Sequence, residues 1–181
     1  MNKTSNTGLT YGLITGLAVI ILTLILYVGG VDMFLSPVAY LVYVIMIVMA
    51  VLAAKKDKKD NGGYLEFAQA LKVTFTVFAL ALLLQVIFNY VLLNFIDTGF
   101  RDALMQATMD KIEGFMKQLG TPQSEIDKAL DGAAEEDPTS IKSQVLGYAI
   151  WCIVFFIVSL IISAIMKKNK PVFENDFNQQ P

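Results

Sequence analysis

The sequence predicts an all-α membrane protein with four transmembrane helices and an amphipathic helical extracytoplasmic segment between the third and the fourth. Hydrophobic residues make up 55% of the 181 residues and charged residues 17%, whereas a soluble domain is about a quarter charged. The apolar residues form four runs, each long enough to cross a hydrocarbon core of about 30 Å. Two lysine clusters follow apolar runs, and lysine is costly to place inside a membrane.

A single membrane domain is expected to occupy residues 1–181, because the chain leaves no room for a second large domain. Its helices are expected at about 9–31, 37–54, 67–95 and 141–166, with an outer helical segment at about 97–136.

The first apolar run, residues 9–31, is interpreted as an uncleaved membrane helix. The alternative is a signal peptide cleaved near residues 29–30, but the run is too long and its start too weakly basic. Gly8, Gly12 and Gly16 recur every four residues on one helix face, and this spacing lets helices approach closely in lipid. We favour packing against another helix of the same chain, with oligomerisation as the alternative.

The second run begins at Ser36-Pro37, because serine is a good N-cap and proline is tolerated at the first helical position. The helix is expected to end at Ala54 and to be followed by a lysine-rich loop. Asn61-Gly62-Gly63 tolerate left-handed backbone, so the chain is expected to turn there.

Two lysine clusters are expected to set the membrane topology. They consist of Lys55, Lys56, Lys58 and Lys59 after the second helix, and of Lys167 and Lys168 after the fourth. Lysine is enriched in cytoplasmic loops, so both clusters are expected inside. The expected location is the bacterial inner membrane, with both termini cytoplasmic and residues 97–140 periplasmic.

Residues 64–72 lead into the third helix with Glu66, Gln69 and Lys72 three residues apart. The favoured interpretation is the first turns of that helix, wetted at headgroup level. The alternative is an interfacial helix that touches lipid or a cytoplasmic partner.

Gln85 and Asn89 lie four residues apart in the third run and share a helix face. Amides in hydrocarbon need hydrogen-bond partners, which neighbouring helices usually supply. A polar pathway is the alternative, but residues 73–95 contain no charged side chain of the kind that transporters use. We therefore expect hydrogen bonds between helices.

Residues 96–140 form the one soluble part, with ten acidic and four basic residues. An amphipathic helix is expected up to Gly120, a second from Thr121-Pro122, and a cap of the fourth membrane helix at Asp137-Pro138. The apolar face of the first helix consists of Met105, Met109, Ile112, Met116 and Leu119. It is expected to rest on the second helix or on the membrane, with an adaptable binding surface as the alternative.

The chain contains no histidine and one cysteine, Cys152, which is expected to be an inert buried thiol. These counts exclude internal disulfides, Cys/His zinc sites and histidine bases. No cofactor and no enzymatic activity are expected, because no residues offer mutually supporting catalytic roles. The net charge of −2 disfavours nucleic acid, so the expected partners are the lipid bilayer and a second copy or another membrane protein.

Three stretches carry a resemblance to a known family. They are Tyr11-Gly12-Leu13-Ile14-Thr15-Gly16, residues 62–72 beginning Gly62-Gly63-Tyr64-Leu65-Glu66-Phe67, and Asn89-Tyr90 through Asn94-Phe95-Ile96-Asp97. The chain resembles an uncharacterised domain-of-unknown-function family of small four-helix inner-membrane proteins from Gram-negative bacteria. The resemblance covers nearly the whole chain and implies an inner-membrane location, no established activity and no catalytic residues. Family members often have an acidic residue where this chain has Gln69.

Three functions are compared on this basis. A non-enzymatic envelope scaffold or regulatory interaction protein is the first, because the glycine, amide and methionine-rich faces all suit packing. A small transporter or channel subunit is the alternative, on the strength of Gln85 and Asn89. A membrane enzyme is the third, and it lacks clustered reactive groups.

Overall fold

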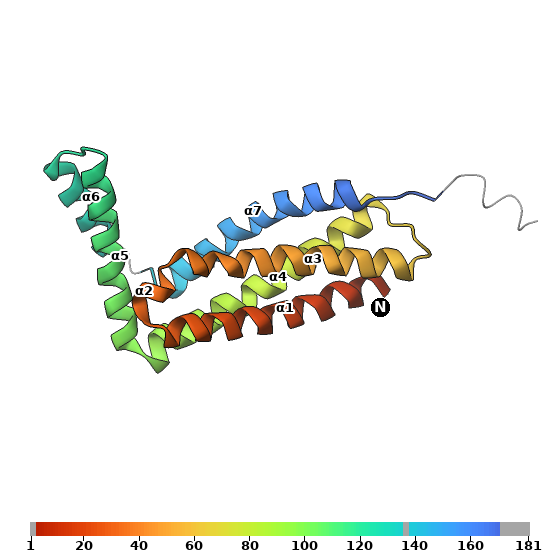
Figure 1. Ribbon diagram of the computed structural model, residues 1–181, viewed down its shortest axis with the longest axis horizontal. Helices are drawn as coiled ribbons and strands as arrows, with labels where there is room; N and C mark the ends of the chain where they lie inside the picture. Colours follow the sequence, from red (N-terminus) through yellow and green to blue (C-terminus); the bar gives the residue numbers. More distant parts are fainter. Residues whose placement is uncertain (1–2, 136–137, 171–181) are drawn as a thin grey trace, which may run out of the picture.

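The structure, a computed structural model, describes residues 3–135 and 138–170 (Figure 1). Its helical elements are α1 (Lys3–Val28), α2 (Gly30–Phe34), the 3-10 turn η1 (Pro37–Tyr40), α3 (Leu41–Asp60), α4 (Phe67–Val91), the π-helical turn η2 (Leu92–Ile96), α5 (Thr98–Gln118), α6 (Gln123–Glu135) and α7 (Ile141–Met166). Four stretches are long and apolar enough to cross a membrane: Asn6–Val28, Pro37–Asp60, Phe67–Ile96 and Ile141–Met166. The predicted all-α membrane fold is therefore confirmed.

The four long helices run side by side, and α4 packs against α1, α3 and α7 (Figure 1). The helices α5 and α6 form a hairpin, here called the arm (residues 98–135), which crosses one end of the bundle and extends beyond it. The start of α1 and the end of α7 both lie at the opposite end (Figure 1). That opposite end carries both lysine clusters and is called the lysine end; the other is the arm end.

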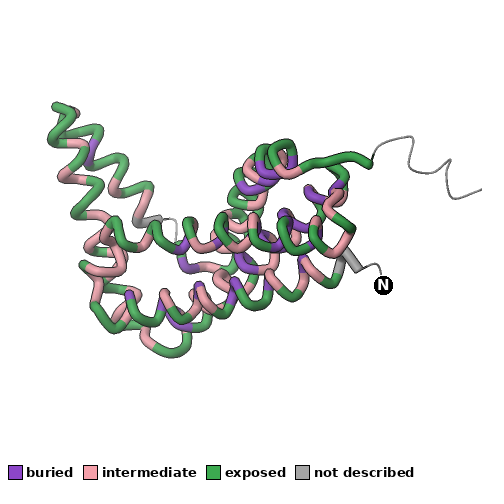
Figure 2. The backbone as a smooth tube through the Cα atoms, turned by 45° about the vertical axis from the view of Figure 1, so that its right-hand side comes forward, coloured by how far each residue is buried: buried purple, intermediate pink, exposed green. Residues whose placement is uncertain are grey.

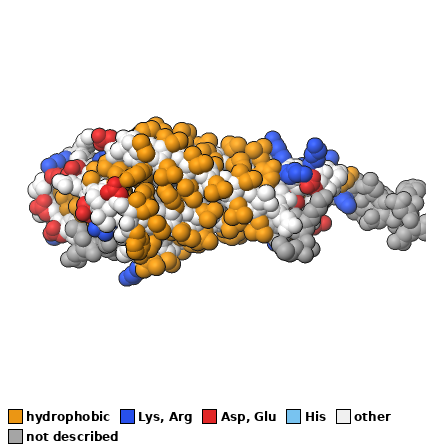
Figure 3. Space-filling view, turned by 90° about the horizontal axis from the view of Figure 1, so that it is seen from below, with side chains coloured by type: hydrophobic (Ala, Val, Ile, Leu, Met, Phe, Trp, Pro, Cys, Tyr) orange, Lys and Arg blue, Asp and Glu red, His pale blue; other side chains and the backbone are white. Residues whose placement is uncertain are grey.

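Apolar side chains cover the middle of the bundle, and charged side chains gather towards its two ends (Figure 3). Buried residues line the inside of the bundle, while much of its outer surface is exposed (Figure 2). Ile21 and Ile153 are 59% and 64% exposed although they are strongly apolar. In a membrane protein such side chains face lipid, so their exposure costs nothing.

The first helix ends earlier than predicted, at Val28 instead of residue 31. Gly30 has a φ of +85°, a left-handed conformation that interrupts an α-helix. The chain then forms the separate short helix α2.

The predicted lysine loop is wrong, because Lys55, Lys56, Lys58 and Lys59 lie in the last turns of α3, which continues to Asp60. Lysine has a high helix propensity, and positive charge is favoured near the C-terminal end of a helix. The helix ends before Gly62 and Gly63, whose φ values are +68° and +87°.

The starts of α4 and α7 are each defined by an N-cap residue. α4 begins at Phe67 with Glu66 in its N-cap position, so residues 67–72 are its first turns. α7 is capped by Ser140, whose side chain accepts a hydrogen bond from the backbone N–H of Ser143. The predicted cap at Asp137-Pro138 is wrong, because α7 begins only at Ile141, and Ser140 directly before it is as good an N-cap as aspartate; Asp137 itself lies outside the described residues.

Candidate functional site

The glycine face of α1 packs closely on α4. A Cβ atom added to Gly12 would lie 2.9 Å from the Cβ of Leu80, and one added to Gly8 would lie 3.0 Å from the Cβ of Thr76. A Cβ on Gly16 would collide with the side chain of Leu84. A helix of the same chain therefore occupies this face.

At the lysine end, the connection between α3 and α4 is tied to the end of α7. Lys58 Nζ donates a hydrogen bond of 2.9 Å to the carbonyl of Met166. Leu65 and Lys168 exchange backbone hydrogen bonds of 2.9 and 2.8 Å, and Lys168 Nζ lies 5.5 Å from the ring centre of Tyr64. Two of the lysines predicted to set the topology therefore also hold structural contacts.

The other lysines of the two clusters face outward. Lys56 forms an ion pair of 2.7 Å with Asp60 on the helix surface. Lys55, Lys59 and Lys167 are exposed. This end of the protein presents a basic surface.

Sequence analysis missed Asp57, which is only 1% exposed. Its carboxylate accepts hydrogen bonds from Thr7 Oγ1 at 3.3 Å and from Asn61 Nδ2 at 3.4 Å. Asp57 lies three and seven residues after the buried Ala54 and Ala50, hence on the core face of α3. That spacing was visible in the sequence, but it has meaning only if residues 55–60 are helical.

Gln85 and Asn89 lie between two hollows near the arm end. One hollow, of about 320 Å³, lies among α1, α3 and α4 and is also lined by Thr23, Ser36 and Tyr40. The other, of about 260 Å³, lies among α3, α4 and α7 and is also lined by Gln144, Tyr148 and Trp151. Tyr43, Gln85 and Asn89 line both.

The expected hydrogen bond between helices is not formed by Asn89, whose Oδ1 atom is buried without a partner among the residues that the structure describes. The rings of Tyr43 and Trp151 stack with centres 4.7 Å apart, so α3 and α7 meet here through large side chains. A buried amide oxygen without a partner is costly, although the Asn89 residue itself lines both hollows.

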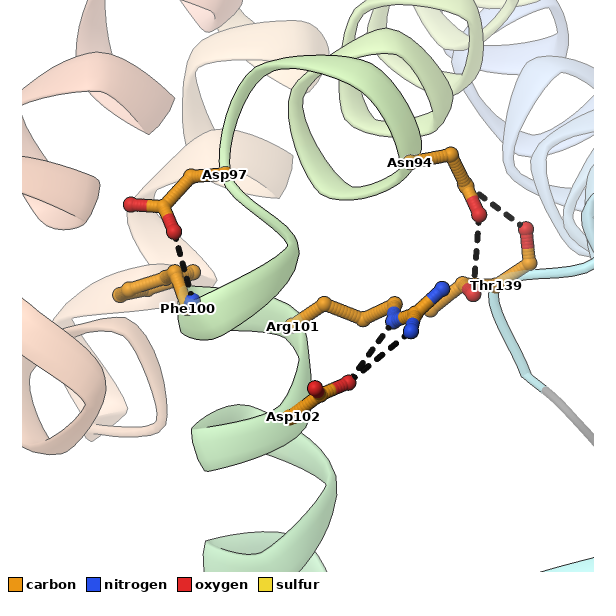
Figure 4. A network of polar contacts seen from close by, with 6 residues as sticks. All are labelled: Asn94, Asp97, Phe100, Arg101, Asp102 and Thr139. Atoms are coloured by element: carbon orange, nitrogen blue, oxygen red, sulfur yellow. Dashed lines mark hydrogen bonds and ion pairs between the residues drawn. The ribbon is translucent and has the colours of Figure 1, made fainter.

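Nearer the surface, Asn94 does bond across elements. Its Nδ2 donates to the carbonyl of Thr139 at 3.1 Å, and Thr139 Oγ1 donates to Asn94 Oδ1 at 3.3 Å (Figure 4). This pair connects η2, which follows α4, to the segment that enters α7.

The root of the arm is fixed by Asp97, which sequence analysis did not single out. Its carboxylate caps α5 by accepting a hydrogen bond of 2.8 Å from the backbone N–H of Phe100 (Figure 4). It also accepts a bond of 2.7 Å from the Tyr27 hydroxyl of α1. The Phe100 N–H and then the Tyr27 hydroxyl lower the pKa of Asp97, since both favour its charged form.

Aromatic contacts support the same root. The ring of Phe100 packs edge-on against Tyr27 at 4.8 Å and against Phe34 at 5.5 Å between centres. Lys111 Nζ, further along α5, donates a hydrogen bond of 2.9 Å to the carbonyl of Leu35. The arm is therefore held to the α1–α3 connection at several points.

An apolar groove of about 480 Å³ lies between the arm and the bundle. Its lining includes Phe34, Leu35, Leu93, Leu104, Met105, Thr108, Met109, Ile112, Ala133, Pro138, Thr139 and Gln144. Part of the predicted methionine-rich face thus lines this groove. Within the described ranges, no group of three or more His, Cys, Asp or Glu side chains is placed to hold a metal ion, and Cys152 is a half-buried free thiol.

A family model described as "Protein of unknown function (DUF4199)" matches residues 10–168. The chain belongs to the DUF4199 family. The match runs from the first membrane helix to Lys168 and so includes the arm and both hollows. It confirms the resemblance to an uncharacterised family, whereas the Gram-negative source stays a prediction. No curated protein and no solved structure matches this DUF4199 chain.

Proposed function

We propose that this protein is a non-enzymatic scaffold of the bacterial inner membrane that holds its arm at the outer surface for interaction with other envelope proteins. The fixed root of the arm is the observation that carries the proposal. Asp97, Phe100 and Lys111 tie α5 to α1, to α2 and to the linker residue directly after α2, although a mere connection between two membrane helices needs no such anchoring.

The charge of the arm supports a partner with a basic surface. Residues 98–135 contain seven acidic side chains (Asp102, Asp110, Glu113, Glu125, Asp127, Asp131 and Glu135) against four basic ones (Arg101, Lys111, Lys117 and Lys128). Most of the polar side chains of α6 are exposed. Complementary charge steers association and selects partners.

Site-specific photo-crosslinking in native membranes tests this proposal. A crosslinker at Asp110, on the arm, is expected to capture a discrete protein, whereas one at the lipid-facing Ile165 is not. Replacing Asp127 and Asp131 together with asparagine should weaken that adduct, and replacing Lys128 with glutamine should not. Equal capture from both positions, or an adduct indifferent to the aspartates, contradicts the proposal.

The same proposal places the lysine end in the cytoplasm and the arm outside, because lysine-rich ends stay inside. A reporter that is active only outside the cytoplasm should be active when fused after Gly120. It should be silent when fused after Gly62 or Lys170. The reverse pattern rules out this topology.

A small transporter or channel subunit is the second candidate, and the two hollows beside Gln85 and Asn89 favour it. Replacing both residues with leucine separates the two candidates. If the protein conducts neutral solutes, the double variant should still assemble, but glycerol and urea should no longer enter proteoliposomes that contain it. Lost assembly, or no entry even through the parent protein, favours the scaffold.

A further inference from the structure

The outer half of α5 carries an apolar face that neither the groove nor α6 covers completely. Ile112, Phe115 and Leu119 are 36%, 63% and 67% exposed. They lie three and four residues apart, so they share one face of the helix. The contiguous exposure of three large apolar side chains on a polar segment indicates a binding surface.

The position of this face follows from the first half of α5. Phe100 packs on Tyr27 and Phe34, and Lys111 bonds to the carbonyl of Leu35. These contacts turn one side of α5 towards the end of the bundle.

Phe115 continues that side, because it lies fifteen residues after Phe100 and four after Lys111. The arm extends past the edge of the bundle (Figure 1). Phe115 and Leu119 therefore lie on the side of α5 that contacts the bundle nearer the start of the helix. Beside a bundle that spans a membrane, the medium at that level is the lipid surface.

The acidic side chains of the outer half of α5, together with Lys117, lie on the other side of the helix; Lys111, which lies closer to Phe115, bonds to the carbonyl of Leu35. At about 100° per residue, Asp110, Glu113 and Lys117 are rotated by roughly 140–160° from Phe115. When Phe115 faces the bilayer, these side chains therefore face water, which is the arrangement of an interfacial helix.

We propose that the outer half of α5 binds the lipid surface directly, with Ile112, Phe115 and Leu119 inserted at headgroup level. Burial of apolar surface drives this contact. The arm is acidic overall, so anionic lipids do not attract it. The inference concerns the face opposite the charged one and does not depend on the proposed protein partner.

Depth-dependent fluorescence quenching tests the proposal on the full chain. Trp151 is the only tryptophan, so Trp151→Phe provides a silent background. Phe115→Trp reports on the proposed lipid face, and Asp110→Trp reports on the opposite face of the same helix. Both are reconstituted in phosphatidylcholine vesicles with and without brominated acyl chains.

The tryptophan at position 115 should be quenched by brominated lipid, and the one at 110 should not. Quenching should be the same with added phosphatidylglycerol and at high salt, because the contact is apolar. Circular dichroism and thermal unfolding of both variants should match the background, which keeps misfolding apart from loss of lipid contact.

Three outcomes overturn the proposal. Absence of quenching at 115 places the face in water. Quenching that needs phosphatidylglycerol makes the contact electrostatic. Quenching at 115 that disappears as the protein-to-lipid ratio rises means that a second copy covers the face. None of these quenching results affects the photo-crosslinking experiment on the charged faces of the arm. The lipid-contact proposal and the protein-partner proposal can therefore each be refuted without the other.

Discussion

At the lysine end the helices meet through small side chains, whereas at the arm end they meet through aromatic rings. The buried residues towards the lysine end include Ala50, Ala53, Ala54, Ala70, Thr74, Ser159 and Ser163. Towards the arm end, Tyr43 packs with Trp151 and Phe155. The two ends therefore differ in the size of the side chains that lie between the helices.

The difference also appears in how buried polar atoms are satisfied. At the lysine end, the hydroxyls of Thr74, Ser159 and Ser163 bond to carbonyls one turn earlier in their own helices. Their polarity therefore costs nothing at the interface between helices. At the arm end, the amide oxygen of Asn89 is an acceptor, so it cannot bond to a carbonyl in this way, and it lacks a partner among the described residues. Buried polar side chains are thus satisfied within single helices at one end of the bundle and lie beside hollows at the other.

The largest expected effect comes from filling the glycine face in the lysine-end half of α1. Gly12→Ile with Gly16→Ile should push α1 off α4 and destabilise the protein by about 2–6 kcal/mol, at about 1–3 kcal/mol per overpacked site. Gly147→Ile in α7 is the matched control, because a Cβ there meets nothing within 4 Å. Thermal unfolding in detergent measures both, and equal losses would mean that the close packing at Gly12 and Gly16 is not what matters.

The next effect concerns the buried carboxylate of the lysine end. Asp57→Ala should cost about 1–3 kcal/mol, because buried donors lose their acceptor. Asp60→Ala, three residues away, should cost much less, because its ion pair with Lys56 lies on the helix surface. Denaturant unfolding ranks the two variants; if Asp60→Ala costs as much, the buried network at Asp57 does not stabilise this end.

At the arm end, replacing a buried polar side chain should have the opposite effect on the stability of the fold. Asn89→Leu removes an unpartnered buried oxygen and should be neutral or stabilise the protein by up to about 1–3 kcal/mol. Asn94→Leu removes two bonds to Thr139 and should destabilise it by a similar amount. A marked loss for Asn89→Leu would show that its amide has a partner in the membrane, such as a bound solute.

The membrane fold was predictable from the sequence because insertion into a bilayer depends mainly on apolar composition and on the length of the apolar runs. The bounds of α7 were predicted fully, since both flanks are polar. The lysine loop was wrong because charge marks where the membrane ends, not where a helix ends. Gly30 ended α1 early, and a glycine's backbone conformation is decided by its surroundings.

Less of the candidate site was predictable. Gln85 and Asn89 were identified by their rarity in an apolar run, but the hollows depend on Tyr43 and Trp151 from other helices. Phe115 was overlooked because the expected apolar face of residues 100–119 was centred on methionines. Its exposure depends on how the arm leaves the bundle, which no local pattern encodes.

The smallest expected effect is a pH dependence at the root of the arm. The fold lowers the pKa of Asp97 through the Phe100 N–H and the Tyr27 hydroxyl, so the charged carboxylate stabilises the folded state. That contribution is complete above the unfolded pKa of about 3.9 and is lost as the pH falls through the lowered folded pKa.

Asp97→Asn should therefore be less stable than the parent near neutral pH and approach the parent's stability in acid. Asp102→Asn, an exposed position on the same helix, should give no such convergence. Amide hydrogen exchange at residues 98–101, followed from neutral to acidic pH, measures the difference where it arises. If the gap between Asp97→Asn and the parent stays constant across that range, the carboxylate's charge does not hold the arm, and the contacts of Phe100 and Lys111 fix it.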